Sequence, residues 1–271
     1  MANLPTRSVR YFEAGSGTPL VLLHAFPLHA EQWLPQLSRV PPRVRVIAPD
    51  LRGFRGSEPF VGGESPDVTM DTYARDVLEL MSHLDVPRAV IAGLSMGGYI
   101  AFAMWRRAPS RINGLVLCNT RAAADREEAR AVRDRLIQLA ETEGAAGLAV
   151  AMMPRLLGET TRREQPDLGD GVELLIRASA PRGLQAAMRA IRDRPDSTPT
   201  LPAITCPTTF IAGAEDTIVP VAEAEMMRAA VRGARLVVLP RAGHLSNLEN
   251  PLAFNDALYA SLAKPPTWTS N

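Results

Sequence analysis

The sequence predicts an α/β protein, in which a mostly parallel central sheet is flanked by helices and a helical cap is inserted after the sixth strand. One observation is that short apolar runs typical of buried strands alternate with helical segments along much of the chain. Another is that about eighty residues in the middle carry helical patterns without a strand signal. The length of 271 residues suits one such domain with an insertion. We therefore predict a core made of residues 1–120 and 201–271 and a cap made of residues 121–200.

The expected strands are short and apolar, and turn residues separate them. They cover residues 8–14, 20–24, 44–48, 89–92, 115–118, 208–212 and 235–239. Helical spacing covers residues 31–40, 69–84, 98–105, 221–231 and 249–262. Within the cap, an apolar stripe lies on a highly charged helix and consists of Ala129, Val132, Leu136 and Leu139. Further helical pieces are expected up to residue 192.

The net charge, the apolar runs and the cysteines argue against nucleic acid or a membrane as a partner and against a disulfide-bonded protein. The net charge of +1 gives no electrostatic reason to bind nucleic acid or an anionic membrane. Residues 1–10 have no apolar signal core, and no apolar run approaches the length of a membrane span. Cys118 and Cys206 are predicted to be buried free thiols rather than a disulfide. We expect a soluble cytoplasmic protein, a monomer or weak homodimer, that binds a small-molecule substrate without a metal or cofactor.

The chain is organised around Gly93-Leu94-Ser95-Met96-Gly97. This segment fits G-x-S-x-G, in which a serine occupies a sharp turn between a strand and a helix. The apolar run before the motif and the helical run after it supply that strand and that helix. Such a turn strains the serine backbone and places its hydroxyl at a helix N-terminus, where developing negative charge is favoured. Ser95 is therefore the predicted nucleophile.

A serine hydroxyl needs a base to take its proton, and the base needs a third group to hold its tautomer. In folds with this motif the chain order is serine, acid, histidine. Asp216 and His244 satisfy this order, and each follows a predicted strand. Glu215 is the competing acid, and Asp216 is favoured over it. The alternative acid position, after the strand that follows the motif, holds Asn119 and Thr120, neither of which is a carboxylate.

The loop His24-Ala25-Phe26-Pro27 leaves the carboxyl end of a predicted central strand, where α/β sheets build their sites. In hydrolases with the G-x-S-x-G motif, one oxyanion donor comes from such a loop and the other from the residue after the nucleophile. The predicted donors are the backbone N–H groups of Phe26 and Met96. His24 precedes the loop and is expected to make structural hydrogen bonds.

The remaining polar candidates have structural explanations. His29 and His83 lack supporting context and are expected at the surface or on helices. Asp50 or Arg52 is expected to pair with loop backbone rather than to take part in chemistry.

Together these features make the chain similar to bacterial α/β-hydrolase carboxylesterases with a small helical cap. That group also holds 3-oxoadipate enol-lactonases and cofactor-free perhydrolases. The resemblance covers nearly the whole chain and rests on residues 24–27 with Trp33, 50–57, 93–99, 118–121, 194–198, 213–216 and 242–251. Members usually have His-Gly where this chain has His24-Ala25, and we expect the additional methyl to affect the rate more than the reaction class.

The resemblance implies a serine carboxylesterase that works through an acyl-enzyme on Ser95. Its predicted pocket is apolar, so a short-chain neutral ester is the expected substrate. The expected pocket residues are Leu28 and Trp33 beside the oxyanion loop and Met152, Met153, Leu156 and Leu157 in the cap. A lactonase such as a 3-oxoadipate enol-lactonase, or a perhydrolase, is the alternative, and a non-catalytic ligand sensor is a more distant one. A haloalkane dehalogenase is disfavoured because the motif holds a serine and not an aspartate.

Overall fold

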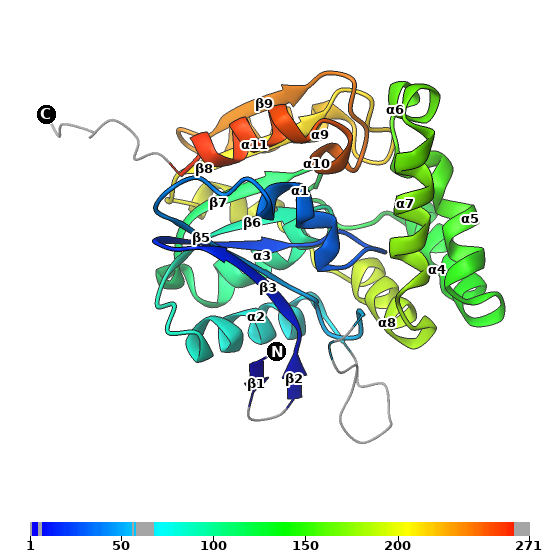
Figure 1. Ribbon diagram of the computed structural model, residues 1–271, viewed down its shortest axis with the longest axis horizontal. Helices are drawn as coiled ribbons and strands as arrows, with labels where there is room; N and C mark the ends of the chain where they lie inside the picture. Colours follow the sequence, from blue (N-terminus) through cyan, green and yellow to red (C-terminus); the bar gives the residue numbers. More distant parts are fainter. Residues whose placement is uncertain (1, 5–6, 56, 58–67, 263–271) are drawn as a thin grey trace, which may run out of the picture.

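The computed structural model describes residues 2–4, 7–55, 57 and 68–262, and within them a seven-stranded sheet forms the centre of the molecule (Figure 1). Its strand order is β3-β5-β4-β6-β7-β8-β9. β3 runs antiparallel to β5, and all other neighbouring pairs are parallel. The strands are β3 (Tyr11–Gly15), β4 (Thr18–Leu23), β5 (Val44–Pro49), β6 (Ala89–Leu94), β7 (Ile112–Cys118), β8 (Thr208–Gly213) and β9 (Arg235–Leu239). The predicted mostly parallel sheet is therefore confirmed.

The central strands are apolar along their length because helices cover both faces of the sheet. Every residue of β6 and of β8 is buried, as are the last four residues of β4. A parallel sheet enclosed in this way produces continuous apolar runs rather than alternating ones. This is the pattern from which these strands were predicted.

Two groups of helices form the outer layers. α2 (Met70–His83), α3 (Met96–Arg107) and α9 (Val221–Ala230) bury their apolar residues against one face of the sheet. α1 (Leu34–Leu37) and α11 (Pro251–Ala260), which follows the short α10 (Ser246–Glu249), pack on the other face. There the Trp33 ring lies 6.0 Å from the Phe254 ring.

A group of helices between β7 and β8 lies at one end of the sheet, drawn in green in Figure 1. We call this group the helical insert; it consists of α4 (Glu127–Thr142), α5 (Gly144–Leu156), α6 (Glu159–Glu164), α7 (Pro166–Arg177) and α8 (Pro181–Arg192). A 3-10 segment, η3 (Thr198–Ala203), leads from it to β8. The insert follows the fifth strand of the seven-stranded sheet along the chain, rather than the sixth. Its helices cover residues 127–192, which fall within the residues predicted as the cap, 121–200.

Two predicted elements near the N-terminus are shorter in the structure. The strand predicted over residues 8–14 is divided at Arg10, because β2 (Arg7–Val9) pairs with β1 (Ala2–Leu4) whereas β3 pairs with β5. The helix predicted over residues 31–40 is a 3-10 turn, η1 (Ala30–Trp33), followed by the single turn α1. Pro35 in the first turn of α1 has no N–H to donate, so the two turns do not merge into one regular helix.

The apolar stripe predicted on α4 is only partly turned inward: Leu136 packs against the core, and Ala129 and Leu139 are half-buried. Val132 is 37% exposed, whereas Ile137 and Ala140 are the buried residues of this helix. Arg133 lies at the border between the buried and the exposed face of α4, and its side chain is only 20% exposed. An arginine stem can be buried along an apolar face while its charged head reaches a polar group or water.

Two further expectations are tested by the described residues. Both cysteines are free thiols, as predicted, and Cys118 is buried whereas Cys206 is only half-buried. Within the described part of the chain, no helix is both long and apolar enough to cross a membrane.

Candidate active site

Ser95 occupies the turn between β6 and α3, in the strained geometry that the motif predicts. Its backbone has φ 53° and ψ −110°, a conformation that residues other than glycine rarely adopt. A Cβ on Gly93 would collide with the Gly97 carbonyl, and one on Gly97 would collide with the Leu23 carbonyl. Both glycines are therefore required for the strand and the helix to approach this closely.

The end of β7 holds the turn from one side. The Ser95 N–H donates to the Cys118 carbonyl (2.9 Å), and the Thr120 hydroxyl donates to the Ser95 carbonyl (2.8 Å). The Ser95 carbonyl also accepts the Gly98 N–H (2.9 Å) of the first turn of α3. The serine backbone is thus fixed by partners on two neighbouring elements, which positions its side chain above the carboxyl end of the sheet.

Asp216 and His244 come together from the loops that follow β8 and β9. His244 Nδ1 lies 2.8 Å from Asp216 Oδ2, and both side chains are buried. The other carboxylate oxygen accepts the N–H groups of Ile218 (2.8 Å) and Val219 (2.9 Å). Because the carboxylate only accepts, Nδ1 is the donor, and a neutral His244 ring has its lone pair on Nε2.

The electrostatics of this pair favour an ionised acid. Burial by itself would raise the pKa of Asp216, but the adjacent His244 and the hydrogen bonds from His244, Asn119 and the Val219 N–H lower it below its ordinary value. Asp216 therefore remains a carboxylate wherever histidine can act as a base. Asn119, which the sequence offered only as a residue that is not the acid, is a direct partner of the acid (2.8 Å).

Glu215, the competing acid, points away from this pair. Its carboxylate accepts the N–H (2.8 Å) and the hydroxyl (2.5 Å) of Thr160 at the start of α6. Burial would raise the pKa of Glu215, but these bonds lower it below its ordinary value. Glu215 thus joins the helical insert to the loop that carries Asp216.

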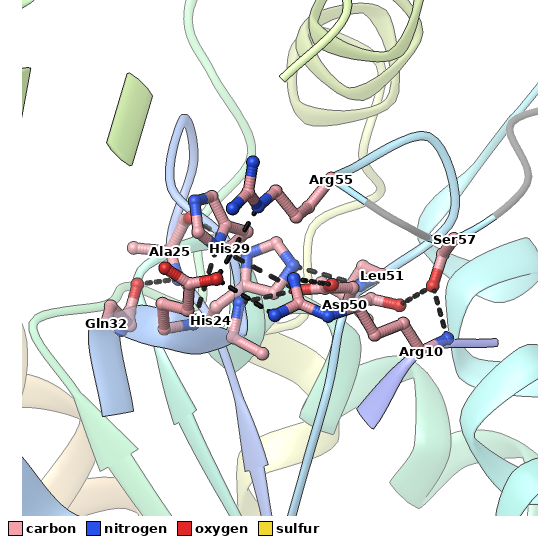
Figure 2. Close-up of polar contacts among 11 residues, drawn as sticks. Arg10, His24, Ala25, His29, Gln32, Asp50, Leu51, Arg55 and Ser57 are labelled. Carbon is pink, nitrogen blue, oxygen red and sulfur yellow. Dashed lines mark hydrogen bonds and ion pairs between the residues drawn. The ribbon is translucent and has the colours of Figure 1, made fainter. Parts of the chain in front are cut away.

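The loop with the first predicted oxyanion donor, Phe26, is held by the His24 ring (Figure 2). His24 Nε2 accepts the Leu51 N–H (3.0 Å), so the ring proton is on Nδ1 and is donated to the Ala25 carbonyl (3.0 Å). Burial lowers the pKa of His24 to about 3, which keeps the ring neutral. The Ala25 N–H donates to Gln32 (2.9 Å). The predicted structural role of His24 is confirmed.

Asp50 supports the same loop from the end of β5. One of its oxygens accepts the Ala30 N–H (2.8 Å), and the other accepts an N–H of Arg10 (3.1 Å; Figure 2). Arg10 also binds Glu31 (2.9 Å). Asp50 therefore binds loop backbone as predicted. Within the described residues neither the Phe26 N–H nor the Met96 N–H has a hydrogen-bond partner, so both donors remain available to a ligand oxygen.

Two other polar residues have partners that the sequence did not indicate. Arg52 does not bind loop backbone but makes two hydrogen bonds, both 2.8 Å, to the carboxylate of Asp76 on α2. This carboxylate is buried, and a buried charge needs a partner of opposite charge. His29 is fully buried rather than at the surface, because its Nδ1 accepts the Glu31 N–H (3.4 Å) and caps η1. His83 lies exposed in the last turn of α2, as expected.

Ser95 and His244 line one small cavity of about 30 Å³ beneath the helical insert. Of the predicted pocket and oxyanion residues, Phe26, Met152 and Leu156 line it. The remaining walls are residues that sequence reasoning missed: Tyr99, Arg133, Ile191 and Ile218. Tyr99 and Ile218 could have been found, because they lie one helical turn after Ser95 and two residues after Asp216. Arg133 and Ile191 carry no such local signal.

The other predicted pocket residues are placed elsewhere. Leu28 and Trp33 are fully buried in the core on the face of the sheet that α1 and α11 cover. Met153 and Leu157 line a different hollow of about 330 Å³ between α5 and α7, away from Ser95. Of the six predicted pocket residues, Met152 and Leu156 line the cavity of Ser95 and the other four do not.

The described residues also contain no group of three or more histidine, cysteine, aspartate or glutamate side chains arranged to hold a metal ion.

A strand, a strained serine turn and a helix on a mostly parallel sheet define the α/β-hydrolase class. The chain matches the model of the alpha/beta hydrolase family over residues 20–257 and belongs to that family. It is 28% identical to 3-oxoadipate enol-lactonase 2 of Acinetobacter baylyi, over 90% of this chain and 88% of that protein.

Two solved structures are similar over nearly the whole chain. A thermophilic esterase from Thermogutta terrifontis, described with malate bound, is 38% identical, with a TM-score of 0.90 over 94% of this chain and 93% of that one. The enol-lactonase from Burkholderia xenovorans is 29% identical, with a TM-score of 0.88 over 97% of this chain and 99% of that one. Both an esterase and a lactonase are therefore among the proteins that this chain is similar to.

Proposed function

We propose that this protein is a serine hydrolase that cleaves carboxylic esters through an acyl-enzyme on Ser95. The observation that carries the proposal is the convergence of Ser95 and His244 on one cavity, with His244 held 2.8 Å from the buried carboxylate of Asp216. A nucleophile, a base and a group that orients the base are the parts that acyl transfer to a serine requires.

In the proposed reaction the Ser95 oxygen attacks the ester carbonyl and His244 Nε2 takes its proton. The Phe26 and Met96 N–H groups bind the oxyanion of the tetrahedral intermediate. His244 then protonates the leaving alcohol, and the carbonyl re-forms as an acyl-serine. Water, deprotonated by the same histidine, attacks the acyl group, and the carboxylic acid leaves as Ser95 recovers its proton.

The helical insert is proposed to act as a cap that limits the acyl group. Met152, Leu156 and Ile191 bring apolar surface from the insert to the cavity. Because these side chains border a small cavity, of about 30 Å³, a short acyl chain is the best fit. We therefore propose a short-chain carboxylesterase, with residues 121–200 as the cap.

Turnover of p-nitrophenyl acetate by the wild type and by Ser95→Ala tests the proposal. We expect the variant to lose about a millionfold in kcat, because removal of a serine from such a group costs that much in a related enzyme. A fluorophosphonate should label the wild type at Ser95 and leave the variant unlabelled. Turnover by Ser95→Ala close to that of the wild type would refute the assignment.

A lactonase, or an esterase for acids with a second carboxylate, is the second candidate, and Arg133 favours it. Arg133 lines the cavity, while its Nε donates to Asp125 (3.1 Å). The same carboxylate also pairs with the buried Arg194 (2.8 Å), so one acid serves two guanidinium groups. An anionic substrate would balance this positive excess. Enol-lactonases among the relatives and malate in the related esterase support this alternative.

The two candidates are separated by p-nitrophenyl butyrate and mono-p-nitrophenyl succinate, which have matched acyl lengths and differ in a terminal carboxylate. If Arg133 binds that group, Arg133→Met lowers kcat/KM for succinate about 10- to 100-fold, the equivalent of one charge-assisted hydrogen bond. It changes kcat/KM for butyrate little. Arg135→Met, at an exposed position of α4, is the matched control. Parallel losses on both esters would exclude a carboxylate site at Arg133.

A further inference from the structure

Asn119 lies at the end of β7, between the loop that carries Asp216 and the loop that carries His244. Its backbone has φ 45°, a left-handed conformation that asparagine tolerates better than most residues. Its N–H donates to the Ile211 carbonyl of β8 (2.9 Å). This hydrogen bond fixes the backbone from which the side chain extends. With 2% of its surface exposed, the residue is shielded from water, so its amide must find partners inside the protein.

The partners of the Asn119 amide determine its orientation. Its Nδ2 group donates to Asp216 Oδ2 (2.8 Å) and to the Gly243 carbonyl (3.1 Å), both of which only accept. Its oxygen accepts the hydroxyl of Ser246 (2.6 Å), in the first turn of α10. One side chain thus links the acid, the residue before His244 and the helix after His244.

The oxygen that Asn119 binds is also the one that binds the base. Asp216 Oδ2 accepts both the Asn119 amide and His244 Nδ1, each at 2.8 Å. A hydrogen bond to a carboxylate stabilises its ionised form and reduces its basicity. A less basic carboxylate stabilises a protonated imidazole less, so the amide opposes protonation of the histidine.

We propose that Asn119 is a positioning residue, which holds Asp216 and the His244 loop in register and sets the pH at which His244 becomes a base. Ser246 holds the amide in the orientation that this role needs. The role of the amide in the Asp216–His244 pair is independent of the substrate, and only its effect on turnover rests on the proposed function.

Other ionisable side chains around the pair do not contact Asn119 and keep their partners when it is changed. Arg133 and Tyr99 line the cavity from α4 and α3, and Arg121 donates to the Ile218 carbonyl beside Asp216. Glu215 binds Thr160, and Glu249 of α10 accepts the Leu245 N–H. A change in the titration of His244 in an Asn119 variant can therefore be assigned to the Asp216 oxygen.

Titration of the His244 imidazole by NMR, in the full-length protein, tests the proposal without a substrate. The chain has four histidines, so a His244→Gln variant assigns the signal. Asn119→Gly and Asn119→Ala delete the same amide, and we expect both to raise the titration midpoint by no more than about one pH unit, because the hydrogen bond acts on His244 only through Asp216. Ser246→Ala should give a smaller rise.

The two Asn119 variants also separate positioning from stability. Glycine accepts the positive φ of residue 119 and alanine does not, so the alanine variant should be the less stable one although the titration shifts are equal. Thr120→Val, which removes a hydroxyl that binds Ser95 and not Asp216, should leave the titration unchanged. Unaltered midpoints in both folded Asn119 variants would overturn the proposal, and Ser246→Ala decides the question if neither variant folds.

The pH profile of kcat/KM gives the kinetic consequence. Its acidic midpoint should move upward in the Asn119 variants by the same amount as the NMR titration. A wild type that hydrolyses no ester would refute the proposed function, while the NMR comparison would still decide the role of Asn119. Shifted kinetics without a shifted titration would contradict the role of the amide.

Discussion

At the scale of single residues, neighbouring carboxylates have entirely different surroundings. Asp216 receives hydrogen bonds from two backbone N–H groups, from Asn119 and from His244. Glu215 receives its bonds from Thr160 of the helical insert. Both carboxylates are kept ionised by their donors, but only Asp216 can orient an imidazole. Because the two residues are consecutive in the chain, their side chains point in different directions, and this difference decides which carboxylate reaches His244.

Asp216→Asn should damage turnover far more than Glu215→Gln. The asparagine keeps the shape of the acid but holds the wrong imidazole tautomer, an effect of about ten-thousandfold in one serine protease. Glu215→Gln should change kcat less than about tenfold, because it alters a contact of the insert and not of the base. Measurement of kcat for both variants with one ester is sufficient. The reverse ranking would show that the acid is misassigned.

At the scale of elements, the end of α5 explains why adjacent leucines face different hollows. Leu156 is the last helical residue and reaches the cavity of Ser95, whereas Leu157 has extended backbone (φ −112°, ψ 143°) and turns toward α7. Both side chains are buried, at 0% and 4% exposure. Truncation of either one should destabilise the protein comparably, by about 2–5 kcal/mol. Only Leu156 borders the proposed site of reaction.

This difference predicts which leucine selects acyl length. Leu156→Ala should enlarge the cavity and shift preference toward longer chains, by about 10- to 200-fold for each methylene accommodated. Leu157→Ala, the same truncation at the neighbouring position, should leave the preference parallel to that of the wild type. The measurement is kcat/KM for acetate, butyrate, hexanoate and octanoate esters. An equal shift in both variants would mean that the insert has repacked as a whole.

At the scale of the whole molecule, the insert is joined to the loops that carry both Asp216 and His244. The buried Glu249 accepts the Gly158 N–H (2.7 Å) and the Thr161 hydroxyl (2.8 Å) of the insert, and also the Leu245 N–H (3.0 Å) next to His244. Burial raises the pKa of Glu249 above its ordinary value, although these donors oppose the rise. Together with Glu215, this residue ties the wall of the cavity to the base and the acid. The insert and the sheet therefore build one site between them.

Local patterns were sufficient to predict most of the fold and to select the side chains of the proposed site. The apolar runs of β6 and β8 and the G-x-S-x-G turn at Ser95 each lie within a few consecutive residues. The order of serine, acid and histidine then selected Asp216 and His244 from segments far apart in the chain. Trp33 and Leu28 were misplaced because apolar character near the oxyanion loop does not say which face of the sheet a side chain joins.

The residues that only the tertiary structure revealed are those whose role depends on a neighbour from another segment. Arg133 belongs to a charged helix whose rotation is set by packing against the rest of the insert, and its sequence pattern suggested a different inward face. Asn119 is separated from Asp216 by 97 positions, and parallel pairing of β7 with β8 brings them together. The sequence by itself determined the sheet, the strained serine turn and the choice of Asp216 and His244 as the proposed acid and base, because these depend on local spacing and chain order. The packing of strands and helices decided what lines the cavity and what holds Asp216, because those contacts join segments that no local pattern connects.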